Sequence, residues 1–87
     1  MKGNKDYKYL EIAGEYYLIP VGAATEKAPA PIQLSETAAW IWRQIGKGVS
    51  DKEMAEKMTL EYDVDLTHAR MAVQSFLGEL FEQGLIE

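Results

Sequence analysis

The sequence contains no cysteine and only one histidine. Without cysteine the chain has no disulfide and no thiolate that would bind zinc or act as a nucleophile. A lone histidine has no partner with which to complete a metal set, so His68 is expected to be an ordinary surface side chain. The glycines do not have the spacing of a phosphate-binding loop. These absences predict a protein without catalytic residues, metal or cofactor.

Long hydrophobic runs are also missing. No stretch approaches the ~18 apolar residues that span a bilayer, and the first residues lack the apolar core of a signal peptide. We therefore expect a cytoplasmic protein that has no membrane partner.

Positive charge is scarce. The chain has 9 lysines and arginines against 14 acidic residues, which gives a net charge of -5. Because nucleic-acid binding depends on neutralising phosphates, an acidic domain without a concentrated basic face is a poor candidate for it. The expected partner is a protein or a peptide.

The strongest helix signal runs from Ser35 to Gly46. Ser35 is a typical N-cap, and Gly46 stands where helices commonly end. Apolar residues recur at helical spacing and form one stripe: Leu34, Ala38, Ile41, Trp42 and Ile45. Trp40 falls opposite this stripe, and we expect it to cover a neighbouring hairpin or, alternatively, to mark a partner surface.

Strand patterns precede this helix. Residues 7–12 and 15–21 alternate and are rich in tyrosine and isoleucine, and a glycine-bearing pair separates them, which predicts a hairpin. Residues 32–34 form a short third strand. Residues 1–6 are expected to be a loose end. Residues 22–31, which hold small residues and prolines, are expected to be a mobile loop that acts as a connector or, less simply, as a binding lid.

Two more helices follow. Ser50 and Glu53 have the spacing of a capping box and begin a helix that ends near Tyr62. The last helix spans about residues 67–83, with Asp65 or Thr67 as its cap, and ends before Gly84. The predicted fold is α+β and winged helix-turn-helix-like, a single domain over residues 1–87 with a three-stranded antiparallel sheet followed by three helices.

Because many helix-turn-helix domains bind DNA, DNA binding is one candidate function. The third helix, however, offers only Arg70 as a cation, and Gln74 is the sole amide well placed for a base edge. A winged-helix transcription regulator is therefore an alternative that the composition disfavours. Another alternative is a structural subunit that associates with itself through the strand edge and Trp40.

Peptide binding fits the pattern better. Strand 32–34 has one edge that the hairpin does not occupy, and such an edge accepts another strand. Arg70, Gln74 and Phe81 fall on a helix flank beside Leu77, which predicts a site for an extended peptide with hydrophobic and acidic side chains. Alternatively, Leu77 and Phe81 complete the core against the C-terminal residues 85–86.

Several segments resemble the PqqD family, which comprises the pyrroloquinoline quinone synthesis protein D and its relatives, also called RiPP recognition elements. They are IAGEYYLIPVG (residues 12–22), IQLSETAAWIW (32–42), EYDVD (61–65), FLGEL (76–80) and GLI (84–86). The likeness covers nearly the whole chain from Tyr7. The Ala-Pro-rich loop before Ile32 differs from the shorter linkers of the quinone pathway, so the resemblance leaves the pathway open.

The resemblance implies a domain that binds the leader segment of a ribosomally made precursor peptide. In the family the leader adds as a strand beside the third strand and lies against the third helix, and a modifying enzyme, often a radical SAM protein, then receives it. The implied strand residues are Ile32, Gln33 and Leu34, and the implied helix residues are Arg70, Val73, Gln74 and Leu77. The hypothesis is a non-catalytic peptide chaperone, monomeric or weakly dimeric, that assists an enzyme by proximity.

Overall fold

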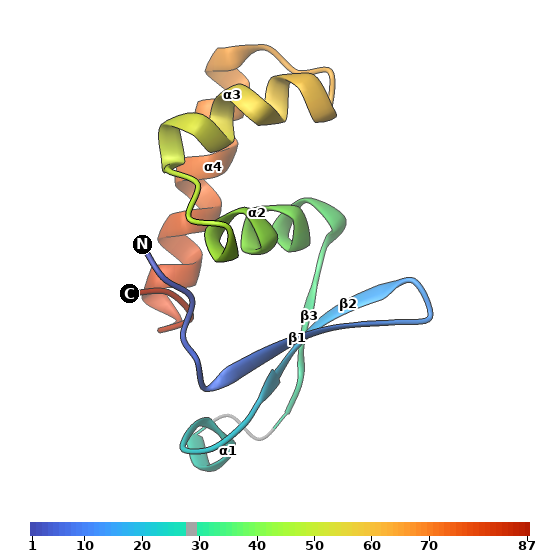
Figure 1. Cartoon of the computed structure of the whole chain (residues 1–87), viewed down its shortest axis with the longest axis vertical. Coiled ribbons are helices and arrows are strands. Elements are labelled where there is room, and N and C mark those ends of the chain that lie inside the picture. The colour runs from blue at the N-terminus through green and yellow to red at the C-terminus, as the bar shows by residue number, and fades with distance from the viewer. Residues whose placement is uncertain (28–29) are drawn as a thin grey trace.

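The computed structural model describes residues 1–27 and 30–87. Its elements follow in chain order: β1 (Tyr7–Ile12), β2 (Glu15–Pro20), α1 (Ala24–Lys27), β3 (Ile32–Leu34), α2 (Glu36–Gly46), α3 (Asp51–Glu61) and α4 (Leu66–Glu82). Figure 1 shows α2 lying between the sheet and α3, while α4 runs along one side of the molecule. The predicted fold class is confirmed: a three-stranded antiparallel sheet precedes the long helices.

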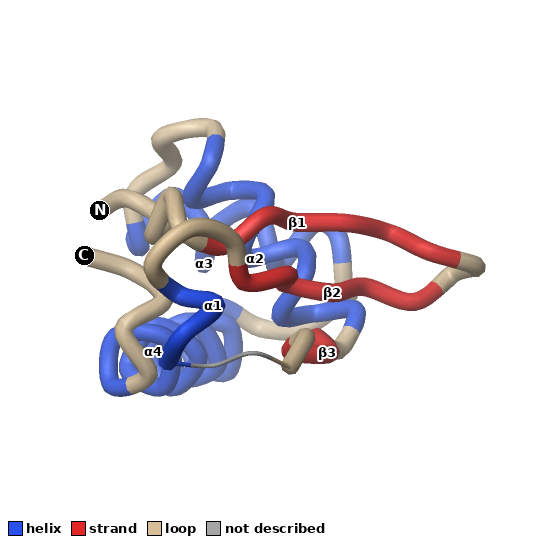
Figure 2. The backbone as a smooth tube through the Cα atoms, turned by 90° about the horizontal axis from the view of Figure 1, so that it is seen from below, coloured by secondary structure: helices blue, strands red, loops and turns tan. Residues whose placement is uncertain are grey.

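The sheet has the order β1-β2-β3, and both pairings are antiparallel. Ala13 and Gly14 connect β1 to β2, and both have positive φ angles, of 52° and 80°. Positive φ at both central residues is typical of a type I′ turn, whose twist matches that of the strands. Figure 2 shows β3 on the α4 side of the sheet and β1 on the far side.

The side chains that the sequence marked as N-caps begin the long helices. Ser35 Oγ accepts a hydrogen bond from the amide of Ala38 at 3.1 Å, and Ser50 Oγ accepts one from the amide of Glu53 at 3.2 Å. For the last helix the sequence left two candidates, and Asp65 is the cap, accepting from the amide of His68 at 2.8 Å. The helix therefore begins at Leu66, one residue before the predicted start.

One core joins the layers. The largest fully buried side chains come from different parts of the chain: Leu18 in β2, Ile41 in α2, Met54 in α3, Val73 in α4, and Leu85 beyond α4. Because α2 contacts β2, β3 and α4, it is the element that joins the sheet to the other helices. The small sheet is thereby held at a fixed place beside α4.

The two ends of the chain pair with each other. The amide of Asn4 donates to the carbonyl of Leu85 at 2.8 Å, and the amide of Glu87 donates to the carbonyl of Lys2 at 2.9 Å. Gly3 lies against the Trp42 ring, where an added Cβ would be 3.1 Å from a ring carbon. The expectation of a loose N-terminus is therefore corrected, because backbone pairing and close packing fix residues 2–4.

The segment that we predicted as a mobile loop, residues 22–31, contains the single helical turn α1. Thr25 Oγ1 donates to the carbonyl of Gly22 at 2.7 Å at the start of this turn. Residues 28 and 29 of the predicted loop lie outside the described residues. The mobility of the segment stays a prediction.

Candidate functional site

The first feature of the site is the outer edge of β3. In a type I′ hairpin with two turn residues, the pair that flanks the turn exchanges both backbone hydrogen bonds, and such pairs then alternate along the ladder. Ile12 and Glu15 flank this turn, so Glu15, Tyr17 and Ile19 direct their backbone groups toward β1. The backbone groups of Tyr16 and Leu18 consequently point the other way, toward β3.

This alternation fixes the direction of the β3 backbone. Tyr16 lies opposite Leu34, and Leu18 lies opposite Ile32, so the N–H and C=O groups of Leu34 and Ile32 bond to β2. The N–H and C=O groups of Gln33 point away from the sheet. Within residues 1–27 and 30–87, no strand pairs with that edge. Gln33 therefore offers one donor and one acceptor to an added strand.

Beside this edge lies a groove between β3 and α4, which we call the β3–α4 groove. It has a volume of about 180 Å³. Its lining residues are Ile32, Gln33, Leu34, Ser35, Ala38, Phe76, Glu79, Leu80, Gln83 and Leu85. The aliphatic and aromatic members form an apolar floor, and two amides, a hydroxyl and one carboxylate form the rim. The volume is smaller than a typical small-molecule pocket of about 300 to 1,000 Å³, and it suits single side chains better than a compact ligand.

Helical spacing and a helix C-cap build the α4 wall of the groove. Phe76 and Leu80 stand four residues apart, as do Glu79 and Gln83, so all four belong to one face. Beyond the helix, Gly84 has a φ of 72°, and the amide of Leu85 donates to the carbonyl of Leu80 at 2.8 Å. This Schellman-type ending turns the chain back and buries Leu85 beside the groove.

The structure brings only part of the predicted site together. Ile32, Gln33 and Leu34 line the groove as a set. Val73 is fully buried and Leu77 is 9% exposed, so both belong to the core. The open edge and these two core side chains therefore do not form one surface.

Arg70 and Gln74 also lie outside the groove. They line a separate hollow between α3 and α4, where Gln74 Nε2 donates to Asp51 Oδ2 at 3.0 Å. A peptide-binding role stays a prediction for Arg70 and Gln74, and for the core residues Val73 and Leu77. The geometry of the groove does not support it. The expectation of an acidic peptide, which depended on Arg70, loses its basis.

Sequence reasoning missed the helix residues that do face β3: Phe76, Glu79, Leu80 and Gln83. Their spacing was a usable signal, because they share one face over the C-terminal half of the helix. The sequence did not say which flank of the helix meets the strand. That choice depends on how α2 separates the sheet from α3, which is a tertiary property.

A second hollow adjoins the groove at the tip of the hairpin, and we call it the tip hollow. Its volume is about 510 Å³, and it shares Gln33, Leu34 and Ser35 with the groove. Gln33 Nε2 donates to the Glu15 carboxylate there, and Glu36 at the start of α2 completes the lining. The open edge at Gln33 thus adjoins both hollows.

A cation–aromatic cluster holds the sheet against α2. Arg43 Nη1 donates to Tyr9 Oη at 2.7 Å, and its guanidinium carbon lies 6.0 Å and 5.8 Å from the ring centres of Tyr9 and Tyr16. The two rings stack with their centres 6.5 Å apart. Such contacts desolvate the cation against aromatic faces and stabilise the packing. The cluster fixes β2, and through it β3, relative to α2.

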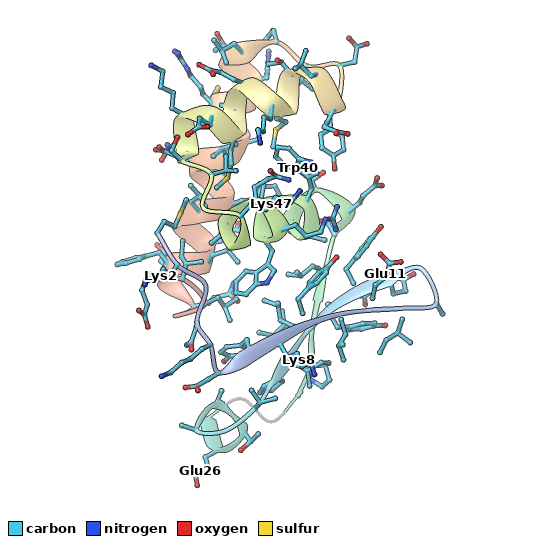
Figure 3. The ribbon with its side chains drawn as sticks, in the orientation of Figure 1. Lys2, Lys8, Glu11, Glu26, Trp40 and Lys47 are labelled. Carbon is cyan, nitrogen blue, oxygen red and sulfur yellow. The ribbon has the colours of Figure 1, made fainter. Side chains whose placement is uncertain are left out.

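Trp40 has a different place from the one predicted. It is 6% exposed and packs edge-on against Tyr62, with ring centres 5.8 Å apart. Figure 3 shows its side chain between α2 and α3, away from the hairpin. The expectation that it covers the hairpin is wrong, because α3 packs on that side of α2. Burial, and next the Glu36 charge, raise the pKa of Tyr62.

The described part of the chain holds no group of three or more histidine, cysteine or acidic side chains placed to bind a metal ion. His68 is exposed, and its ring nitrogen Nδ1 contacts Asp65 Oδ1 at 2.8 Å. The hydrogen bonds from the His68 amide and ring lower the pKa of Asp65. None of the described helices has both the length and the apolar character needed to cross a membrane.

Comparisons with known proteins bear on the family and on the fold. A family model described as coenzyme PQQ synthesis protein D (PqqD) matches residues 26–86. No curated protein matches the chain. A solved structure of TbiB1 in complex with the TbiA(beta) leader peptide has the same fold, with a TM-score of 0.83 and 22% sequence identity. The match covers 100% of this chain and 95% of the TbiB1 chain.

Proposed function

Because this chain belongs to the PqqD family, we propose that it binds the leader segment of a ribosomally made precursor peptide as a strand added to β3. The observation that carries the proposal is the outward N–H and C=O of Gln33 beside the β3–α4 groove. The structure of TbiB1 with a leader peptide supports it, since the two chains share a fold.

The groove gives the added strand two kinds of contact. Gln33 pairs with the peptide backbone, which any sequence provides, so it sets the register rather than the preference. Side chains of a strand point alternately to opposite faces, so every second peptide residue enters the groove. There it meets an apolar floor that includes Ile32, Leu34 and Leu80. Preference for one peptide over another therefore comes from the groove.

The proposed role is presentation rather than chemistry. The domain performs no reaction; it holds the leader and so raises the local concentration of the precursor at a modifying enzyme, such as a radical SAM protein. It acts as a monomer or a weak dimer in the cytoplasm, where ribosomes release the precursor. No cofactor is needed for this role.

The test is an NMR titration of the isotope-labelled chain with a leader peptide. The probe is a synthetic peptide with the sequence of a candidate leader segment, the N-terminal half of a short precursor peptide. We expect the amides of residues 32–35 and of the C-terminal half of α4 to shift and to become protected from hydrogen exchange. Shifts confined to α3 or to the α3–α4 hollow would contradict strand addition at β3.

A binding assay with duplex DNA tests the alternative function, a winged-helix transcription regulator. A DNA regulator would bind generic duplex with an affinity that falls steeply with salt. We expect no such binding, because Arg70 is the only lysine or arginine in α4. Tight, salt-dependent binding of duplex would overturn the proposal in favour of the regulator.

A further inference from the structure

The charged residues that line the two hollows flanking β3 are all acidic. Glu79 is the charged residue of the β3–α4 groove, and Glu15 and Glu36 are those of the tip hollow. A strand that adds to the edge of β3 at Gln33, which lines both hollows, therefore lies near carboxylates. Arg70, the cation from which an acidic peptide was expected, lines the other hollow.

Glu79 has no partner within the described chain that explains its position. The one ion pair found among the described side chains joins His68 and Asp65, far along α4 from Glu79. Glu79 lies in the last turn of the helix, where a negative charge opposes the helix dipole. Its side chain thus stands on the rim of an apolar groove, without an ion-pair partner among the described side chains and at an electrostatically unfavourable end of the helix.

Resting on the proposed function, we infer that the bound leader carries a lysine or an arginine opposite Glu79, next to apolar residues that fill the groove. The floor excludes charge, since burying an unpaired ion there is costly, whereas the rim accepts a cation that keeps contact with water. The net charge of -5 favours the approach of the same kind of peptide. The ligand class is therefore a hydrophobic and basic extended peptide.

The chain offers a matched pair of variants for the test. Glu79→Lys reverses the charge on the groove rim. Glu82→Lys makes the same change in net charge three positions later, at an exposed residue that does not line the groove. Both variants place a cation in the last turn of α4, where the helix dipole favours it, so both are expected to fold. Thermal melts by circular dichroism check this.

The probe is a display library of short random peptides, selected in parallel on the unmodified chain, on Glu79→Lys and on Glu82→Lys. We expect the unmodified chain and Glu82→Lys to enrich lysine or arginine at one position, at a fixed spacing from two apolar residues. Glu79→Lys should enrich aspartate or glutamate at that position. With a selected peptide, exchanging its cation for glutamate should weaken binding about three- to tenfold, and Glu79→Lys should restore the affinity. The effect should shrink in high salt.

Two results would overturn the inference in different ways. If enriched peptides lose affinity for Gln33→Pro but carry the same charges whether position 79 is Glu or Lys, the strand site stands and the basic preference fails. If no peptide is enriched, or if the enriched peptides bind Gln33→Pro equally well, strand addition at β3 fails and the inference fails with it.

Discussion

A proline at position 33 tests the central feature of the site, which is the outward backbone of β3. Gln33→Pro removes the amide hydrogen that faces the open edge and leaves the pairing of Ile32 and Leu34 with β2 in place. Proline is tolerated on an edge strand when its nitrogen faces away from the ladder, and the residue before it is already extended. We therefore expect the free energy of unfolding to change by no more than about 1 kcal/mol.

The expected effect on peptide binding is larger. The peptide carbonyl that would accept from Gln33 is left without a donor beside the apolar groove, and a buried unsatisfied group costs about 1–3 kcal/mol. That range corresponds to a dissociation constant weaker by about five- to 150-fold. Gln33→Ala keeps the amide and removes the side chain with its hydrogen bond to Glu15, so it separates the side-chain contribution from the backbone contribution.

The opposite edge of the sheet supplies a matched control. By the same alternation, the N–H of Glu11 in β1 points away from β2, toward the outer edge on that side. Glu11→Pro introduces the same ring on an edge strand that lies away from α4 (Figure 3). We expect it to leave peptide affinity unchanged. Fluorescence anisotropy with the labelled leader measures all three variants, and urea unfolding checks their folding. Equal affinity for Gln33→Pro and Glu11→Pro would refute strand addition to β3.

Three further predictions concern the groove, the core and the dependence of stability on pH in acid. Phe76→Ala should weaken leader binding about tenfold because it removes part of the groove floor, while Arg70→Ala should not change it; anisotropy measures both. Trp40→Ala should lower the free energy of unfolding by about 3–5 kcal/mol in a urea titration, since the ring is buried in the core; a loss below about 1 kcal/mol would contradict this placement. The lowered pKa of Asp65 stabilises the fold above its ordinary value of 3.8, and this stabilisation is lost as pH falls through the lower folded value. Asp65→Asn keeps a capping oxygen and should flatten that acid dependence in thermal melts, whereas an unchanged slope would count against it.

Local signals account for what the sequence predicted well. The Ser35, Ser50 and Asp65 caps each act within three residues, so they mark helix starts without knowledge of the rest of the chain. The hairpin is predicted from equally local signals, because Ala13 and Gly14 lie between two segments with the alternating pattern of strands. The order and type of the strands and of the long helices therefore followed from short-range chemistry, whereas the peptide-binding role of Ile32, Gln33 and Leu34 came from the family resemblance and stays a prediction.

The misplaced residues have a shared cause in long-range packing. A helical wheel shows that Trp40 is off the main stripe of α2, yet it does not show that α3 covers that flank. The same wheel places Arg70 and Glu79 on surfaces of α4 and gives no reason to prefer either as the neighbour of β3. In both cases the choice is between two sides of a helix, and only contacts between distant segments decide it.

Because β3 is short, its open edge gives the free protein little tendency to pair with unrelated strands. The same shortness bears on the proposed binding of a leader peptide. An exposed edge is a hazard because it accepts any strand, and a short edge limits that hazard. Here the described strand offers the outward N–H and C=O of Gln33 alone, and the hydrogen bonds that they make contribute about 0.5–1.5 kcal/mol each, which cannot hold a peptide. Useful affinity must therefore come from side chains that fill the β3–α4 groove and meet its rim. If the proposed function is right, we expect indiscriminate strands to bind weakly, and a leader to be selected by its apolar residues and by the charge it presents to Glu79.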